Sequence, residues 1–525
     1  MKQLCIVVAL VSVFGLSFQK STPQDTHYVA AVVEYHRLTT NVQNNTARYV
    51  SLIQEAARQN ADIVVFPELT LTNAQYTFEV PINGLVKEQP VPALYPSGYD
   101  EAITAISQAA LDNQIYVVIN GRESLDCRLA ATRAVEYCPE EKAYIFNTNV
   151  VFDRKGAIID RYRKINLFGE VAHTPALRPE LGKFTTDFGV TFGHFVCFDL
   201  MFQVPAIQVV QKEKIKNVIF PTMWFSELPY LSAVQIQEAY AYSLDVNFLG
   251  AGANNVRVGS AGSGIYSGKA GALISTMPGV SDTRLLVARV PKVPGQITEP
   301  FPGPIYDNPT THDNLKLIID PSLASHKSRL LVPGFQEFTL EDGDVSCTFR
   351  VNIGRRTGNE YYRYRAGAFS GVRSFSGVAT GGMRACSVYA CTGDERDTCG
   401  MRFSPYVANA TAIFMELTIR ATMPTPVVTE NLQADGSVVY PVSLSVATLP
   451  LETREYSYAK VPSGDRTLHI YSLENKAAEL YSFAVWGRQF STDGQNATDP
   501  ITDGASVHFL SHFMLVLVAI VLRQF

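Results

Sequence analysis

The segment Phe195-Val196-Cys197-Phe198-Asp199 places a thiol just after an apolar run that begins at Val190. The run predicts a buried strand, and Cys197 then lies at a sharp turn into a helix, where backbone N–H groups lack helical acceptors and can hold an anion. A free cysteine is, however, more often a structural core residue than a nucleophile. Cys197 alone leaves both interpretations open, so the rest of the chain has to decide between them.

Two further segments place reactive groups beside apolar runs. Val65-Phe66-Pro67-Glu68 ends in a carboxylate, and Arg163-Lys164-Ile165-Asn166-Leu167-Phe168 carries an ammonium group. Each alone has a simpler interpretation, because Glu68 suits a helix start and Lys164 suits a solvated cationic run. Together with a thiol they supply a base and a stabiliser of the thiolate and the oxyanion. We therefore predict catalytic roles for Glu68, Lys164 and Cys197.

Other polar and aromatic residues are weaker candidates. Glu170 is a second carboxylate that can orient Lys164 or a substrate amine. Trp224 and Tyr266 are candidate walls of the substrate pocket, although both are equally consistent with ordinary core residues. His194 and Cys197 have the spacing of metal ligands, but no second pair lies nearby, so we predict no metal. A papain-like cysteine protease is disfavoured because the sequence context of that family is absent around Cys197.

The order of segments predicts two domains. Between residues 25 and 290, helix-like and strand-like segments alternate, which is typical of an α/β layered domain. Residues 291–329 are rich in Pro, Gly, Asn and Thr and predict a linker or a segment that wraps around a domain. Residues 330–495 contain short alternating strands and predict a β-rich second domain.

Both ends of the chain carry targeting signals. Residues 1–20 combine a basic start with an apolar core and predict a secretory signal peptide. Residues 496–525 combine small residues with an apolar stretch that is short for a membrane-spanning helix, which favours a GPI-attachment signal with Gly504 as the weakly preferred site. A tail anchor or a buried terminal strand is the alternative. We expect an extracellular, GPI-anchored protein at the cell surface.

Sequons and cysteines agree with an extracellular route. Asn44, Asn409 and Asn496 each begin an Asn-X-Thr sequon. Without Cys5 of the signal peptide, seven cysteines remain, and an odd number predicts one free thiol, for which Cys197 is the natural candidate. Cys127 and Cys138 are expected to pair locally, whereas three pairings stay open for the last four cysteines: Cys347, Cys386, Cys391 and Cys399. The formal net charge of −5 gives no reason to expect a nucleic-acid partner.

The Glu, Lys and Cys segments, in this order, resemble the nitrilase superfamily of carbon–nitrogen hydrolases. Further segments are similar to its vanin/biotinidase branch: Phe220-Pro221-Thr222-Met223-Trp224, Leu228-Pro229-Tyr230-Leu231-Ser232-Ala233-Val234-Gln235, Gly262-Ser263-Gly264-Ile265-Tyr266 and Tyr364-Arg365-Ala366-Gly367-Ala368-Phe369. The resemblance implies an α/β fold, namely an αββα sandwich followed by a β-rich C-terminal domain. It also implies an amidase with no metal and no organic cofactor.

The resemblance leaves the substrate open. Vanins cleave pantetheine to pantothenate and cysteamine and carry a GPI signal, whereas biotinidase releases biotin from lysine conjugates and is usually soluble. The tail favours pantetheine as the small-molecule amide substrate and biotinyl-lysine as the alternative. A catalytically silent surface protein that uses the same scaffold for adhesion is the alternative of a different class. The sequence does not predict an oligomeric state.

Overall fold

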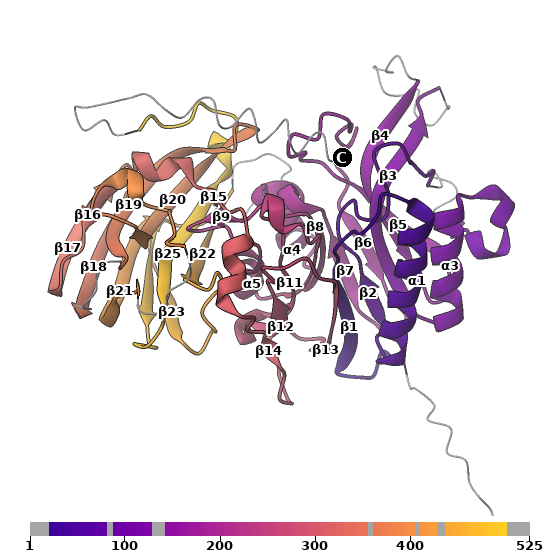
Figure 1. Ribbon diagram of the computed structural model, residues 1–525, viewed down its shortest axis with the longest axis horizontal. Helices are drawn as coiled ribbons and strands as arrows, with labels where there is room; N and C mark the ends of the chain where they lie inside the picture. Colours follow the sequence, from indigo (N-terminus) through magenta and orange to yellow (C-terminus); the bar gives the residue numbers. More distant parts are fainter. Residues whose placement is uncertain are drawn as a thin grey trace, which may run out of the picture.

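The computed structural model describes residues 20–80, 88–128, 142–354, 361–404, 410–427 and 436–500. Most of the predicted signal peptide, Cys138, Asn409 and Gly504 lie outside the described residues. The described chain forms an α/β part and an all-β part that lie side by side (Figure 1).

Two stacked sheets form the centre of the α/β part. The six-stranded sheet consists, in spatial order, of β13 (Arg284–Pro291), β1 (His27–Glu34), β2 (Ile63–Val65), β3 (Tyr116–Asp126), β4 (Ala143–Phe152) and β5 (Ile158–Arg163). The seven-stranded sheet consists of β14 (Gly303–Pro304), β12 (Ala272–Thr276), β11 (Ser263–Ser267), β10 (Asn247–Gly252), β8 (Asn217–Thr222), β7 (Thr191–His194) and β6 (Gly182–Thr185).

The period of two along β1 explains the layers. Tyr28 and Val32 point into the core between the two sheets, whereas Ala31 and Val33 point into a second core beneath the helices. Because both faces of the strand are apolar, both must be covered. The helices α1 (Val42–Arg58) and α3 (Glu101–Asn113) cover the outer face of the six-stranded sheet (Figure 1).

The other outer layer contains α5 (Ala233–Leu244) and the short α4 (Gln208–Gln211). α4 continues directly from a π-helical turn, Gln203–Ile207, inside which Val204 has extended backbone and precedes Pro205. In the opposite helix layer, α1 begins at Val42, where the Asn41 side chain caps it by accepting the Asn44 N–H at 2.8 Å. The layer order of this part is αββα.

The all-β part is a sandwich of two five-stranded sheets around their own core. The first sheet consists of β16 (Lys327–Leu330), β19 (Arg363–Phe375), β20 (Ala379–Cys391), β25 (Leu480–Gln489) and β22 (Ser437–Ser445). The second sheet consists of β17 (Gly334–Asp342), β18 (Val345–Gly354), β21 (Ile413–Pro424), β24 (Arg466–Leu473) and β23 (Tyr456–Ser463).

One continuous core joins the two parts. Tyr240 on α5 belongs to the same buried cluster as Tyr440 on β22 and Trp486 on β25. The segment expected as a linker, 291–329, is part of this junction: β14 extends the seven-stranded sheet and β15 (Ile318–Ile319) pairs with β9 (Glu227–Leu228). β16 begins at Lys327, within the predicted linker. The segment thus wraps onto both parts.

The late cysteines form two disulfide bonds, Cys347–Cys386 and Cys391–Cys399. The first joins the two sheets of the sandwich, because Cys347 lies on β18 and Cys386 lies on β20. Cys127 is also disulfide-bonded, while its expected partner Cys138 lies outside the described residues. Cys197 is a free cysteine.

A buried arginine bridges three segments at the junction. Arg373, near the end of β19, is fully buried and lies 2.7 Å from Glu227 Oε1 on β9 and 3.0 Å from Asp320 Oδ2 after β15. Burying three charges is costly, and their mutual attraction together with hydrogen bonds offsets that cost. Removing one member leaves the others buried without compensation.

We therefore expect Arg373→Ala to lower the free energy of unfolding by about 3–5 kcal/mol. Urea unfolding of the purified protein measures this change. Arg350→Ala is the control, since Arg350 pairs with Glu416 at 3.0 Å on an exposed face and should change stability by no more than about 1 kcal/mol. Equal effects of the two substitutions would contradict a structural role for the buried cluster.

Candidate active site

The structure brings the three predicted catalytic residues together at the ends of three strands. Glu68 follows β2, Lys164 follows β5, and Cys197 follows β7 in the other sheet. All three side chains are at least 95% buried. Lys164 Nζ donates to Glu68 Oε1 at 2.7 Å and forms an ion pair with Glu170 Oε2 at 2.9 Å. The predicted contact between Glu170 and Lys164 is thus present.

Two carboxylates fix the charge of Lys164. Burial lowers the pKa of a lysine, but the negative charges of Glu170 and Glu68 outweigh it and raise the pKa of Lys164 well above its ordinary value. Lys164 also lowers the pKa of Glu170, against the opposing effect of burial. Lys164 is therefore a permanent cation, and two of its three N–H donors are directed at carboxylates.

An asparagine that the sequence analysis missed orders the two carboxylates. Asn147 on β4 donates through Nδ2 to Glu68 Oε1 and to Glu170 Oε1, both at 2.7 Å. Asn120 on β3 in turn donates to Asn147 Oδ1 at 2.8 Å. Buried amides on strands that are otherwise apolar are costly unless they are hydrogen-bonded. The segment Phe146-Asn147-Thr148-Asn149 places amide side chains within an apolar run, and this pattern could have identified Asn147 from the sequence.

Cys197 adopts a strained backbone conformation. Its φ of +46° lies in the left-handed region, which residues with a Cβ rarely occupy. The turn aims the thiol at the cavity edge, where Sγ lies 3.6 Å from the carbonyl oxygen of Met223. The N–H of Met223 donates to Glu68 Oε2 at 2.8 Å. The backbone of one residue thus holds the carboxylate and the thiol next to each other.

The environment keeps the thiol protonated in the absence of substrate. Burial and the nearby Glu68 carboxylate raise the pKa of Cys197 far above its ordinary value, and Lys164 only partly opposes them. Attack by this sulfur therefore requires a base that accepts the proton during the reaction. Glu68, whose charge contributes to this pKa shift, is the predicted candidate for that base.

Asp199 joins the cysteine turn to the lysine segment. Its Oδ1 accepts the backbone N–H of Asn166 at 2.8 Å, and its Oδ2 accepts the hydroxyl of Tyr162 at 2.7 Å and the N–H of Val196 at 3.1 Å. Burial raises the pKa of Asp199 to about 6. Asp199 is therefore a positioning residue that fixes Lys164 relative to Cys197.

Two cavities meet at Cys197. One has a volume of about 270 Å³ and is lined by Glu68, Lys164, Glu170 and Cys197, among others. His173 also lines it, and neither nitrogen of its ring has a hydrogen-bond partner within the described chain. The cavity therefore offers a reactive edge and spare polar groups for a substrate.

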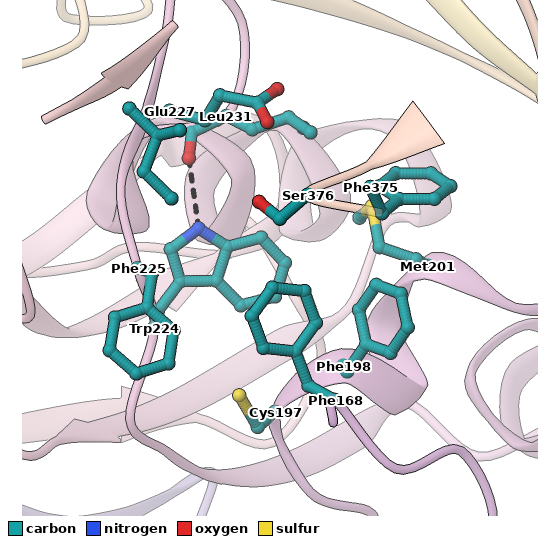
Figure 2. Close-up of a pocket in the computed structure, with 11 residues that line it drawn as sticks. Phe168, Cys197, Phe198, Met201, Trp224, Phe225, Glu227, Leu231, Phe375 and Ser376 are labelled. Carbon is teal, nitrogen blue, oxygen red and sulfur yellow. Dashed lines mark hydrogen bonds between the residues drawn. The ribbon is translucent and has the colours of Figure 1, made fainter. Parts of the chain in front are cut away.

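The other cavity is small, about 40 Å³, and aromatic (Figure 2). Phe168 and Phe198 lie above the thiol with ring centroids 4.9 Å apart, and Trp224 donates its indole N–H to the carbonyl oxygen of Leu231 at 2.8 Å. Phe375 and Ser376 come from the all-β part, just after the buried Arg373. The second domain therefore contributes directly to the pocket.

The two predicted aromatic pocket residues have different positions. Trp224 lines the aromatic cavity. Tyr266, on β11, is fully buried in the core and lines neither of the cavities that reach Cys197. Its position is that of an ordinary core residue, 6.4 Å from Phe248 between ring centroids.

The remaining predicted sites are distributed over the surface. Asn44, in the first turn of α1, and Asn496 are exposed, whereas Asn409 lies outside the described residues. Among the described side chains, no three His, Cys, Asp or Glu residues gather as a metal-binding group. Within the same residues, no helix is both long enough and apolar enough to cross a membrane. The disulfides fit an extracellular compartment.

Comparisons with known proteins agree with this architecture. The carbon-nitrogen hydrolase family matches residues 29–274, and the Vanin C-terminal domain matches residues 316–493. Vanin-like protein 1 of Drosophila melanogaster is 32% identical over 507 residues, which cover 91% of this chain and 88% of the relative. The matches therefore extend over both parts of the structure.

Two other relatives have names that state an activity. Pantetheinase of Mus musculus is 28% identical over 362 residues, covering 66% of this chain and 68% of the relative. Biotinidase of Homo sapiens is 33% identical over 285 residues, covering 50% and 52%. With both family matches and a relative aligned over nearly its whole length, this chain belongs to the vanin/biotinidase family of the nitrilase superfamily and is a carbon–nitrogen hydrolase that acts on amides.

Proposed function

We propose that the protein hydrolyses a linear amide through a thioester on Cys197, with Glu68 as the base and Lys164 as the oxyanion stabiliser. One observation carries the assignment. The Met223 backbone contacts both the Glu68 carboxylate and the Cys197 thiol, while Lys164 donates to the same carboxylate. The carboxylate, the ammonium group and the thiol are thus held close together in a cavity, as covalent amide hydrolysis requires.

The first half of the reaction forms the thioester. Glu68 takes the thiol proton as Sγ bonds to the amide carbonyl carbon, and the carbonyl oxygen becomes an oxyanion. Lys164 stabilises this charge together with a backbone N–H near Phe198, at the start of the turn that follows Cys197. The C–N bond then breaks, and the leaving amine takes the proton from Glu68.

The second half releases the acid. Glu68 accepts a proton from a water molecule while the oxygen of that water attacks the thioester carbonyl carbon. The second tetrahedral intermediate collapses, the C–S bond breaks, and the proton on Glu68 returns to the sulfur. The net reaction consumes one water for each amide, and the enzyme needs no other reactant. Glu170 acts as a positioning residue that keeps Lys164 charged.

We propose pantetheine as the substrate and biotinyl-lysine (biocytin) as the alternative. Relatives named pantetheinase and biotinidase support both, and the predicted tail anchor favours pantetheine. Side-by-side hydrolysis of pantetheine and biocytin by the purified ectodomain tests the assignment, with kcat/KM as the measured quantity. A higher value for pantetheine supports the proposal, and a higher value for biocytin replaces it. Turnover of neither supports the silent adhesion protein.

We also propose that residues 1–20 are removed as a signal peptide and that a GPI anchor replaces the tail within residues 496–525, near Gly504. The domains would then be 25–290, catalytic, and 330–495, β-rich. Phosphatidylinositol-specific phospholipase should release the protein from the cell surface. Phe525 found by mass spectrometry in the mature surface protein contradicts the anchor. Release into the medium without phospholipase indicates simple secretion.

A further inference from the structure

A third cavity, of about 560 Å³, adjoins the catalytic cavity. Leu69, Met223 and Phe225 line both, and Phe225 also lines the aromatic cavity. Leu69 directly follows the proposed base, and Met223 contacts both Glu68 and Cys197. A substrate whose amide lies at Cys197 therefore has a second space into which one of its ends can extend.

The lining of this third cavity is cationic. It includes Arg37, Arg257 and His36, and none of its described lining residues is an aspartate or a glutamate. A third guanidinium, that of Arg48, hydrogen-bonds to the carbonyl oxygen of His36 at 3.3 Å. The chain as a whole has a formal net charge of −5, so the positive charge of this cavity is opposite in sign to the net charge of the protein.

The arginines retain donors for a ligand. Arg37 uses Nη1 to donate to the carbonyl oxygen of Thr72 at 3.0 Å, which leaves its Nε and Nη2 groups. Arg257 lies in the short turn Val256–Val258, is exposed, and has no hydrogen bond or ion pair within the described part of the chain. His36 contacts the carbonyl oxygen of Asn254 through Nδ1 at 3.1 Å, so Nε2 is the ring nitrogen that remains.

Glu68 lies beside the lining residues Leu69 and Met223, but its carboxylate is paired with Lys164. Two further acidic residues, Glu34 and Asp282, contact Asn254 of the lining and do not neutralise this charge. Glu34 lies behind Asn254, whose Nδ2 donates to it at 3.0 Å, and burial raises the pKa of Glu34 to about 7. Glu34 is therefore only partly ionised at neutral pH. Asp282 accepts from Arg284 Nε at 2.8 Å, so its charge is already paired. The cavity keeps an excess of positive charge next to the reaction centre.

We infer that the cavity of Arg37, Arg257 and His36 is a subsite for an anionic group, a carboxylate or a phosphate, at one end of the amide substrate. This inference rests on the proposed amide hydrolysis. Guanidinium groups suit both anions because their paired N–H donors match two oxygens. The subsite would favour amides that carry such a group over neutral amides of the same shape.

Two matched pairs of probes test the subsite. Pantetheine and 4′-phosphopantetheine differ by a phosphate on the acyl side, and biocytin and its carboxamide differ by a carboxylate on the amine side. For at least one pair, we expect kcat/KM to be about tenfold or more higher for the anionic member, since hydrogen bonds to charged groups are the strong ones. The responding pair identifies which end of the substrate enters the cavity.

Arg257→Gln should reduce that anionic-to-neutral ratio about tenfold, and Arg257→Lys should restore part of it. Arg37→Gln should act in the same direction. Arg58→Gln is the matched control, because it removes an exposed arginine of the same domain whose partner is Glu55. An equal preference for both members of each pair in the wild type overturns the subsite. So does an anionic preference that Arg257→Gln leaves unchanged.

Binding separates this inference from the proposed function. The same probes and inorganic phosphate are titrated into the Cys197→Ala protein, with and without Arg257→Gln, by calorimetry. Tighter binding of the anions that depends on Arg257, without any turnover by the wild type, retains the subsite and rejects the proposed reaction. Turnover by the wild type without Arg257-dependent anion binding retains the proposed reaction and rejects the subsite. Binding of no anion at all overturns the subsite.

Discussion

Cys197→Ala is expected to abolish amide hydrolysis, with a loss of at least about a thousandfold in kcat, while the protein stays folded. The sulfur atom forms the covalent bond in the proposed reaction, and Glu68 and Lys164 have other roles in it, as base and as oxyanion stabiliser. Loss of one buried heavy atom should cost only about 1 kcal/mol of stability. The φ of +46° adds no further penalty, because cysteine and alanine both carry a Cβ there.

Two measurements accompany this test. Thermal unfolding monitors the fold, and intact-mass spectrometry after rapid acid quench seeks the acyl adduct on the wild-type protein. The adduct should add the mass of the acyl group to the wild type and be absent from Cys197→Ala. Retained turnover by the alanine protein, or an adduct mapped to another residue, would remove Cys197 from the role of nucleophile.

Lys164→Met is the second substitution with a large expected effect, because it should impair activity and stability together. Loss of the cation removes a positioned oxyanion donor, which typically lowers kcat about a hundredfold or more. It also leaves Glu68 and Glu170 buried next to each other without compensation, at a cost of about 3–5 kcal/mol. Steady-state kinetics and urea unfolding measure the two effects.

The double substitution Lys164→Met with Glu170→Gln separates the two roles of Lys164. Removing one carboxylate relieves part of the unbalanced charge, so stability should recover partly, whereas activity should stay low because the oxyanion donor is still absent. Recovery of kcat along with stability would show that Lys164 acts only by balancing the charge of the carboxylates. Near-normal kcat in Lys164→Met alone would exclude the oxyanion role altogether.

The interface between the two domains also forms part of the substrate pocket. Phe375 and Ser376 line the aromatic cavity and follow Arg373, whose ion pairs with Glu227 and Asp320 fix the end of β19. Arg373→Ala should therefore affect the shape of the pocket as well as stability. The all-β part is in this sense a component of the substrate pocket.

The sequence by itself determined the class of fold and predicted the candidate reactive groups. The apolar runs before Glu68 and Cys197 predict buried strands, and residues at strand ends converge at a sheet edge. Such patterns are local, so a single chain shows them directly. Cys197 was predictable as the free thiol because an odd number of cysteines leaves one without a partner.

Only the tertiary structure decided which distant groups meet. The Asn147 contacts with Glu68 and Glu170, the Cys347–Cys386 pairing and the cationic cavity of Arg37 and Arg257 each join segments that no local pattern connects. Tyr266 lies in the core while Trp224 lines the pocket, although both are aromatic residues in family-like segments. The physical reason is that burial and strand ends follow from hydrophobic periodicity, whereas the packing of two sheets and a second domain fixes which side chains face the same cavity.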